Sequence, residues 1–260
     1  MTRRQTNPCY PELNSFLDNI RTQFDQNGTT IYKVRNEVKN IQYKDFILNV
    51  KSFKVPHLLN RFVYSYIRKS KARRSYEYAM TLERKGVTTP APVGYIENTH
   101  NGLLQDSYYI SLCYPYDFTI REVLEGRVDN KDEILESFAR YCWNVLHRNG
   151  VFHLDFSPGN ILIRKINSDY EFSLIDLNRM KFCKIDPIIG LKNLRQLHTT
   201  VENMQIIARA FGSEAGLDPE WCAEKLIAMD RSYQNYRSRR QAFKKGIKKL
   251  NPISAFRKHF

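Results

Sequence analysis

The segment from Val151 to Ile163 constrains this chain most, because it places a polar loop between two apolar runs. The loop carries the pattern His-x-Asp-x-x-x-x-Asn, formed by His153, Asp155 and Asn160. Sixteen residues after Asn160, another apolar run ends in a second acid, Asp176. A hairpin between the apolar runs would bring Asp176 back beside Asn160. The pattern predicts strands on both sides of a loop that gathers polar side chains.

Such a group of side chains suits phosphoryl transfer, in which a protein holds Mg²⁺ on the phosphates of ATP and orients a hydroxyl group. Asp155 can accept the hydroxyl proton, while Asn160 and Asp176 supply the hard oxygen ligands that Mg²⁺ prefers. For His153, packing under the loop with hydrogen bonds to the backbone is favoured over proton transfer. For Asp155 and Asp176, the alternative is that they only cap the loop.

The first half of the chain offers a matching cation and its counter-charge. Lys51 lies in the apolar run 46–53, where a lysine is costly unless it is paired with an anion. Glu77, on the helix predicted to follow, is the natural partner. Two alternatives stay open: Lys51 and Glu77 are ordinary surface residues, or Lys54 takes the place of Lys51.

Local patterns predict a mixed fold. Strands are expected at 29–34, 37–42, 46–53, 93–97, 108–113, 161–163 and 172–175. Helices are expected at about 70–85, ending at Gly86, and over 134–145, 194–207 and 219–229, the last behind Asp218 as N-cap. This predicts an α+β fold, with a small antiparallel-sheet N-terminal lobe carrying one key helix and a mainly helical C-terminal lobe.

The positive charge is concentrated at the C-terminal end. The chain has 41 Lys and Arg against 27 Asp and Glu, a net charge of +14, and residues 231–260 hold ten basic residues and no acidic one. Apolar residues at near-helical spacing predict a basic amphipathic helix there: Tyr233, Tyr236, Phe243, Ile247 and Leu250. Packing on the body, contact with an anionic membrane surface and, least favoured, nucleic-acid binding stay open. A second acid-free basic stretch, 61–74, strengthens the case for an anionic partner.

Composition also bears on location. No apolar run approaches the roughly 18 residues of a spanning helix, and the first residues lack the apolar core of a secretion signal. The five cysteines are odd in number and widely separated, which indicates reduced thiols. The expected location is cytoplasmic.

Taken in order, these motifs resemble the protein-kinase-like bilobal fold, and more narrowly the lipopolysaccharide core kinases that act on Kdo or heptose. The narrower resemblance covers roughly residues 25–210 and rests on five segments: Arg35-Asn36, 50–56, 70–77, 89–92 and 155–160. It implies an N-terminal lobe over 1–113 that binds ATP phosphates, a C-terminal lobe over 114–230 with the catalytic loop and Mg²⁺ site, and the basic tail 231–260.

The resemblance also implies roles for individual residues. Lys51 would hold the α- and β-phosphates of ATP, and Glu77 would orient Lys51. Asp155 would be the catalytic base. The metal ligands would be Asn160 and Asp176.

Two departures from the kinase pattern qualify these roles. The glycine-rich loop is replaced by Arg35-Asn36, so side chains there would also contact phosphates. The Asp-Phe-Gly motif appears as Asp176-Leu177-Asn178, and no Ala-Pro-Glu follows, which argues against a conventional protein kinase. Tyr114, in the segment 114–116, would lie against adenine at the hinge.

The function expected from the sequence is an ATP- and Mg²⁺-dependent kinase. It would phosphorylate a hydroxyl of Kdo or heptose on a lipid-A-linked acceptor at the cytoplasmic membrane face, as a peripheral protein. The alternatives are a soluble small-molecule or protein kinase of the same fold, and a pseudokinase that binds nucleotide without phosphoryl transfer.

Overall fold

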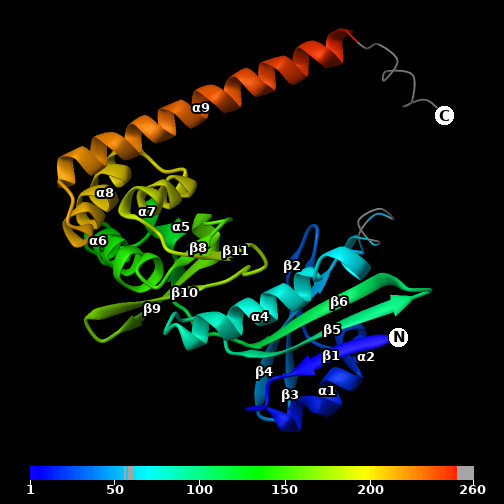
Figure 1. Cartoon of the computed structure of the whole chain (residues 1–260). Coiled ribbons are helices and arrows are strands. Elements are labelled where there is room, and N and C mark those ends of the chain that lie inside the picture. The colour runs from blue at the N-terminus through cyan, green and yellow to red at the C-terminus, as the bar shows by residue number, and fades with distance from the viewer. Residues whose placement is uncertain (56, 58–60, 62, 251–260) are drawn as a thin grey trace.

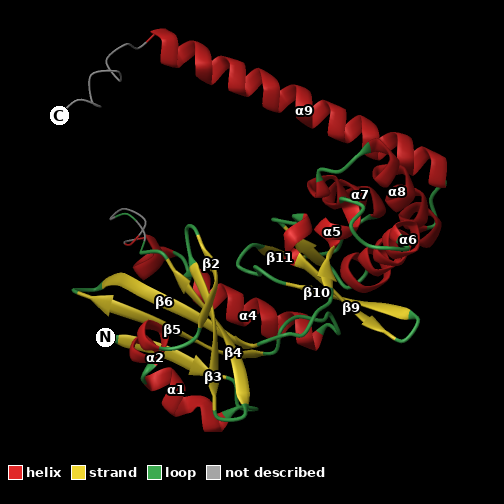
Figure 2. Cartoon of the chain, turned by 180° about the vertical axis from the view of Figure 1, so that it is seen from behind, coloured by secondary structure: helices red, strands yellow, loops and turns green. Residues whose placement is uncertain are grey.

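A six-stranded antiparallel sheet forms the N-terminal half of the molecule (Figures 1 and 2). The computed structural model describes residues 1–55, 57, 61 and 63–250. The sheet has the order β1-β5-β6-β4-β3-β2. Its strands are β1 (Thr2–Thr6), β2 (Thr29–Lys33), β3 (Glu37–Tyr43), β4 (Phe46–Phe53), β5 (Pro92–His100) and β6 (Leu103–Leu112). The strands predicted between residues 29 and 113 are therefore confirmed.

Alternation along β4 divides the sheet into two faces. Leu48 and Val50 are fully buried on one face, against a cluster that includes Phe16 and Phe24 from the helices α1 (Asn14–Asp18) and α2 (Ile20–Gln26). Because successive side chains of a strand point to opposite faces, Lys51 and Phe53 lie on the other face. Besides the predicted key helix, this lobe contains α1, α2 and the short turn η1 (Pro11–Leu13), which the sequence did not predict and which pack on the face of Leu48 and Val50.

Helix α4 (Lys71–Arg84) covers the other face of the sheet. It begins at Ser70, whose hydroxyl accepts a hydrogen bond from the backbone N–H of Arg73 at 3.1 Å. It ends before Gly86, whose φ of +68° is a left-handed conformation that glycine adopts without strain. Both ends agree with the sequence prediction. A π-helical turn, η2 (Val63–Ile67), precedes it.

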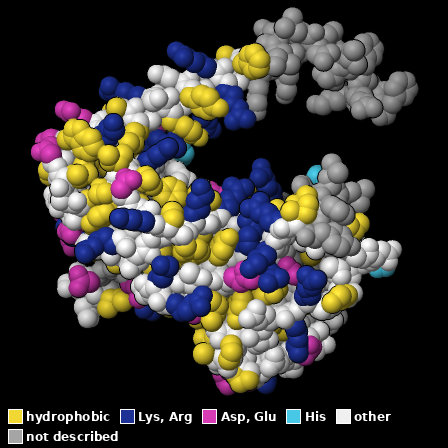
Figure 3. Space-filling view, viewed as in Figure 1, with side chains coloured by type: hydrophobic (Ala, Val, Ile, Leu, Met, Phe, Trp, Pro, Cys, Tyr) yellow, Lys and Arg dark blue, Asp and Glu magenta, His cyan; other side chains and the backbone are white. Residues whose placement is uncertain are grey.

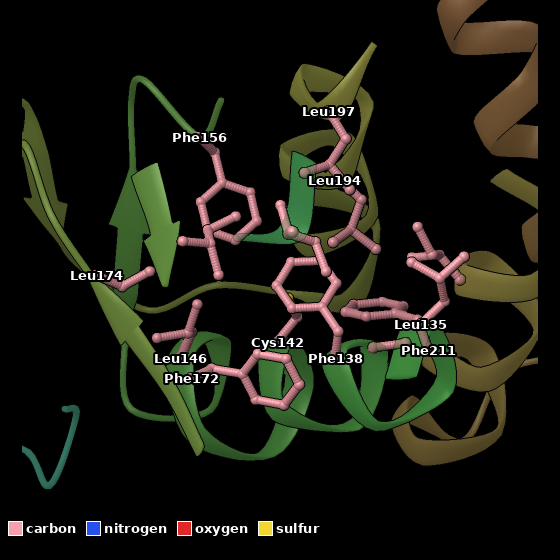
Figure 4. Packing of buried hydrophobic residues seen from close by; sticks show 14 of the residues in the cluster. Leu135, Phe138, Cys142, Leu146, Phe156, Phe172, Leu174, Leu194, Leu197 and Phe211 are labelled. Carbon is pink, nitrogen blue, oxygen red and sulfur yellow. The ribbon is translucent and has the colours of Figure 1, made fainter. Parts of the chain in front are cut away.

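The C-terminal half combines small sheets with a helical core. Its strands are β7 (Phe118–Thr119), β8 (Val151–His153), β9 (Ile161–Ile166), β10 (Asp169–Leu174) and β11 (Met180–Phe182). Its helices are α5 (Ile120–Leu124), α6 (Lys131–Tyr141), η3 (Cys142–His147), η4 (Pro158–Asn160), α7 (Pro187–Leu194), η5 (Arg195–Leu197), α8 (Val201–Ala215) and α9 (Pro219–Leu250). Figure 4 shows the core between them. The α+β class is confirmed, with one lobe built on a sheet and one mainly helical.

The core extends directly under the polar loop. The ring centroids of Phe138 and Phe156 are 5.9 Å apart, and those of Phe138 and Phe172 are 5.5 Å apart. All three rings are at most 3% exposed. Phe156 belongs to the loop itself, so burial of its ring fixes the loop to the body.

Two helix predictions were wrong. The single helix expected over 194–207 is broken at His198, whose φ is +48°, and a new helix begins behind Thr200 as N-cap. The helix behind Asp218 does not end near Met229 but continues to Leu250. The predicted tail 231–260 is thus part of α9 as far as Leu250, and residues 251–260 lie outside the described residues. No described helix is both long and apolar enough to cross a membrane.

Candidate active site

His153, the last residue of β8, supports the polar loop from below. Its side chain is 1% exposed, with Nε2 3.1 Å from the carbonyl oxygen of Ile175 and Nδ1 accepting a hydrogen bond from the backbone N–H of Asp155 at 3.0 Å. Burial lowers its pKa, an effect that outweighs the bond to Ile175 and the nearby carboxylates. The neutral ring therefore links two segments of the site, which confirms the structural interpretation of His153.

The loop holds Asp155 and Asn160 in fixed relation. The Asn160 side-chain nitrogen donates to the carbonyl oxygen of Asp155 at 2.9 Å, and the N–H of Ser157 donates to the same oxygen at 2.8 Å. In the part of the chain that the structure describes, no group donates to the side-chain oxygen of Asn160. The Asp155 carboxylate is 42% exposed and meets Arg179 Nη1 at 3.3 Å. The loop thus presents one carboxylate and one amide oxygen for binding.

The hairpin β9–β10 brings Asp176 to this loop, as predicted. The strands pair antiparallel with Leu174 opposite Ile161, and the N–H of Ile175 donates to the carbonyl oxygen of Asn160 at 3.0 Å. Asp176 itself has φ +55°, a left-handed conformation uncommon for residues other than glycine. Its Oδ1 accepts from Asn178 Nδ2 at 2.6 Å.

Lys51 crosses from the sheet to Asp176. Its Nζ lies 2.7 Å from Asp176 Oδ1, and the two side chains are 18% and 31% exposed. Burial alone would raise the pKa of Asp176. The charge and hydrogen bond of Lys51, with smaller contributions from His153 and Asn178, outweigh burial and lower that pKa. The carboxylate therefore stays ionised and available to a cation.

The contact expected between Lys51 and Glu77 is not formed. Glu77 instead accepts from Lys69 Nζ at 2.7 Å and from Arg73 Nε at 2.8 Å. Burial raises the pKa of Glu77, but the hydrogen bonds from these two cations lower it overall. Because Arg73 is one turn before Glu77 on α4, the acid finds its partner on its own helix.

The basic face of α4 adjoins Asp176, a position that was not predicted for the basic stretch 61–74. Arg74 is 6% exposed and its Nη1 donates to the carbonyl oxygen of Asn178 at 2.8 Å. One turn later, the ring of Tyr78 packs on Phe182 at 5.4 Å. Lys71 lies one turn before Arg74 on this face. The spacing 71, 74, 78 was the available signal, because only one face of α4 can adjoin the second lobe.

The charged groups of the site, Arg179 and Asp176, also act on Lys71. Burial, followed by the charge of Arg179, lowers the pKa of its ammonium group, while Asp176 opposes the shift. Among the described residues, Lys71 makes no salt bridge of its own. Lys51 contacts Asp176 and Arg179 contacts Asp155, while Lys71 and Arg74 lie on the adjoining face of α4. The site thus carries an excess of positive charge, which favours binding of an anion.

The remaining predicted site residues lie further out. Asn36 Oδ1 accepts from the backbone N–H of Lys54 at 3.4 Å, and the side chains of Arg35 and Lys54 are exposed. Lys54 therefore does not replace Lys51 beside Asp176. The Tyr114 hydroxyl bonds to Glu171, and Arg164 lies 5.4 Å over its ring. Burial, with the Glu171 bond, raises the pKa of Tyr114.

The donor set fits a magnesium ion carried with phosphate. The described residues contain no cluster of three His, Cys, Asp or Glu side chains able to hold a metal. Asn160 and Asp176 together offer two oxygen ligands, and Mg²⁺ commonly takes one or two protein oxygens while phosphates and water complete its shell. The surrounding cations would neutralise the phosphates.

Comparison with known proteins agrees with this geometry. A search of curated proteins finds no match. Among solved structures, WaaP in complex with acyl carrier protein is similar, with a TM-score of 0.55 and 18% identity over 87% of this chain and 99% of that one, which shows a shared fold. A sequence model of the lipopolysaccharide kinase (Kdo/WaaP) family matches residues 54–211, more than half of the chain. The matched part contains Asp155, Asn160 and Asp176, and the chain belongs to the lipopolysaccharide kinase (Kdo/WaaP) family.

Proposed function

We propose that this kinase transfers the γ-phosphoryl group of ATP, with Mg²⁺, to a hydroxyl of an inner-core lipopolysaccharide sugar, Kdo or heptose, on a lipid-A-linked acceptor. The observation that carries the proposal is the 2.7 Å ion pair between Lys51 and Asp176, formed beside the loop of Asp155 and Asn160. Family membership supports the reaction class, and the site supplies a residue for each step.

Asp155 acts as the base in this proposal. Its carboxylate is accessible to the acceptor, and its backbone is held by Ser157, Asn160 and the ring of His153. The acceptor oxygen forms a bond to the γ-phosphorus, the bond from that phosphorus to ADP breaks, and the hydroxyl proton passes to Asp155. A base that is positioned by its backbone stays in line with the acceptor.

Cations on both sides of Asp176 hold the nucleotide phosphates. Lys51 binds the α- and β-phosphates, and Lys71 adds a second ammonium group at the first turn of α4. Asn160 and Asp176 hold Mg²⁺, which offsets charge on the transferred group when bound. Arg35 and Asn36 extend these contacts in place of a glycine-rich loop, and Tyr114 borders the adenine.

The acceptor is anionic and lies at the cytoplasmic face of the membrane, where this protein is peripheral. Lipid A phosphates and the Kdo carboxylate match the excess of positive charge around the site. In this proposal, residues 1–113 bind the phosphates of ATP, residues 114–230 carry out catalysis and bind Mg²⁺, and residues 231–260 contact the membrane surface.

Transfer of labelled γ-phosphate from Mg·ATP to Kdo-lipid A and to heptosylated core lipid tests the proposal. The matched blank is Asp176→Ala. Label on lipid that is absent with the variant supports the proposal and identifies the sugar. Transfer only to protein or to small alcohols would favour a soluble kinase, and ATP binding without any transfer would favour a pseudokinase.

A further inference from the structure

Helix α9 leaves the body of the protein at Tyr233. Before that point its inner face is packed, since Cys222 and Leu226 are at most 1% exposed. Tyr233 contacts the body: the Arg195 guanidinium lies 3.8 Å over its ring, and His198 stacks on it at 5.8 Å, while the residues from 234 to 243 are exposed. Figure 1 shows the helix continuing well beyond the helices that it packs on.

Residues 234–250 of α9, here called the arm, extend about 25 Å at 1.5 Å per residue. Every residue from 234 to 243 is exposed, including Tyr236 at 60% and Phe243 at 70%. These two aromatic side chains share one side of the helix, seven residues apart. In the sequence, Ile247 and Leu250 continue the same spacing. A single exposed aromatic needs no explanation, but a spaced series on a helix that packs on nothing within 234–243 indicates a surface with a partner.

The charge of the arm identifies the kind of partner. Arg237, Arg239 and Arg240 are all exposed, and the sequence 231–260 contains ten basic residues and no acid. Figure 3 shows basic and apolar side chains side by side along this helix. A second copy of the arm would be repelled, because it carries the same charge. An anionic surface with an apolar interior meets both properties of the arm.

We propose that the arm lies along an anionic lipid surface, with Tyr236 and Phe243 entering the headgroup region and the arginines binding lipid phosphates. Arg240 falls between the two aromatics on the helix, where its long stem allows the guanidinium to reach the headgroups. Binding of the arm stands on exposure and charge alone. Delivery of a lipid-linked acceptor to the site of Asp155 and Asp176 rests in addition on the proposed function.

Flotation of the full chain with vesicles tests this inference. We expect binding to vesicles of phosphatidylcholine with phosphatidylglycerol, and none to phosphatidylcholine alone. Replacing the three arm arginines together, Arg237→Gln, Arg239→Gln and Arg240→Gln, should lower the partition coefficient roughly 100-fold. The matched control removes three exposed lysines of the body, Lys184→Gln, Lys192→Gln and Lys225→Gln, and should bind nearly as wild type.

A second variant separates insertion from charge attraction. Phe243→Trp should show a blue shift of its emission with anionic vesicles, relative to the wild-type background of Trp143 and Trp221. Equal binding by the arm and control variants would overturn the proposal, as would salt-sensitive binding to RNA or to an acidic protein without binding to vesicles. Asp155→Asn should bind vesicles fully, so loss of kinase activity and loss of membrane binding are distinguishable.

Discussion

The loop 153–160 and the pair of elements β4 and α4 contribute to one site, but they are held in different ways. Inside the loop, bonds join near neighbours: His153 Nδ1 accepts from the N–H of Asp155, and the Asn160 side chain donates to the carbonyl oxygen of Asp155. The β4 and α4 side meets the second lobe through residues far apart in the sequence: Lys51 pairs with Asp176, 125 positions away, and Arg74 donates to the carbonyl oxygen of Asn178, 104 positions away. A motif whose residues bond to near neighbours can be recognised from the sequence. Which residues pair across the two lobes depends on how the lobes pack.

The largest effect is expected at the loop. Asp155→Asn keeps the shape of the side chain but removes the base, so kcat should fall about 100- to 10,000-fold while ATP binding is kept. Single-turnover transfer and nucleotide titration measure the two quantities. Asp169→Asn, an exposed acid on the adjoining hairpin, is the control and should be neutral. An unchanged kcat with Asp155→Asn would show that Asp155 is not the catalytic base.

The second prediction concerns pH, because the helical lobe holds two buried neutral histidines. Burial lowers the pKa of His147 to about 4, and burial also lowers that of His153. Unfolding frees both rings to bind protons, so their contribution to stability is complete above pH 6.5 and is lost as pH falls toward 4. For His147 alone the loss approaches about 3 kcal/mol.

Urea unfolding between pH 7 and 4.5 measures this loss. His147→Gln should flatten the dependence, and His100→Gln, which alters an exposed ring in the sheet lobe, should leave it unchanged. A pH dependence that persists in full in His147→Gln would contradict the assignment.

The third prediction concerns the ion pair of Lys51 with Asp176, one of the bonds between the lobes. Lys51→Met leaves Asp176 without its cation and removes a phosphate contact, so kcat/KM for ATP should fall roughly 10- to 100-fold. Steady-state kinetics with varied ATP measure it. Lys54→Met is the natural control, because Lys54 is exposed and nearby in sequence. If Lys54→Met lowered kcat/KM for ATP more than Lys51→Met, then Lys54 and not Lys51 would be the lysine that binds the phosphates.

Lys71→Met tests the face of α4 that the sequence analysis missed. Loss of one partly exposed cation near the phosphates should raise KM for ATP about fivefold, corresponding to ~1 kcal/mol, with kcat little changed. Arg84→Met, at the far end of the same helix, controls for general effects on α4. An unaltered KM would exclude Lys71 from phosphate binding.

The smallest effect is expected at Glu77. Its partners are the surface cations Lys69 and Arg73, so Glu77→Gln should change kcat/KM less than about threefold. Glu83→Gln on the same helix serves for comparison. A fall as large as that of Lys51→Met would mean that Glu77 reaches Lys51 during turnover.

The sequence predicts best where the pattern is local. The sequence predicted the strands from their apolar runs and turn signals, the end of α4 from Gly86, and the return of the chain to Asp176 from a hairpin. Helices α1 and α2 were missed because they are short and neither has a side-chain cap. The break in the helix at His198 could not be predicted, because no glycine or proline marks it in the sequence.

In the site, too, the sequence predicted local contacts better than contacts between distant elements. His153, Asp155 and Asn160 fall within eight residues of one another, and the backbone bonding of His153 was predicted from this short motif. Glu77 was given the wrong partner because the side of α4 that faces Lys51 depends on how the helix packs against the sheet. The continuation of α9 past Met229 was missed because a change in composition was taken as a boundary, although no helix-breaking residue stands there.

The unbroken course of α9 has a mechanical consequence. From residue 220 to 245 the helix contains no glycine or proline, so it acts as a lever fixed to the body at Tyr233. A flexible tether would let the active site turn freely above a surface, whereas a continuous helix fixes its orientation. Inserting one alanine after Asn235 would rotate everything beyond it by about 100° around the helix axis without changing the charge of the arm. Attachment would survive such an insertion, but the active site would face a different direction.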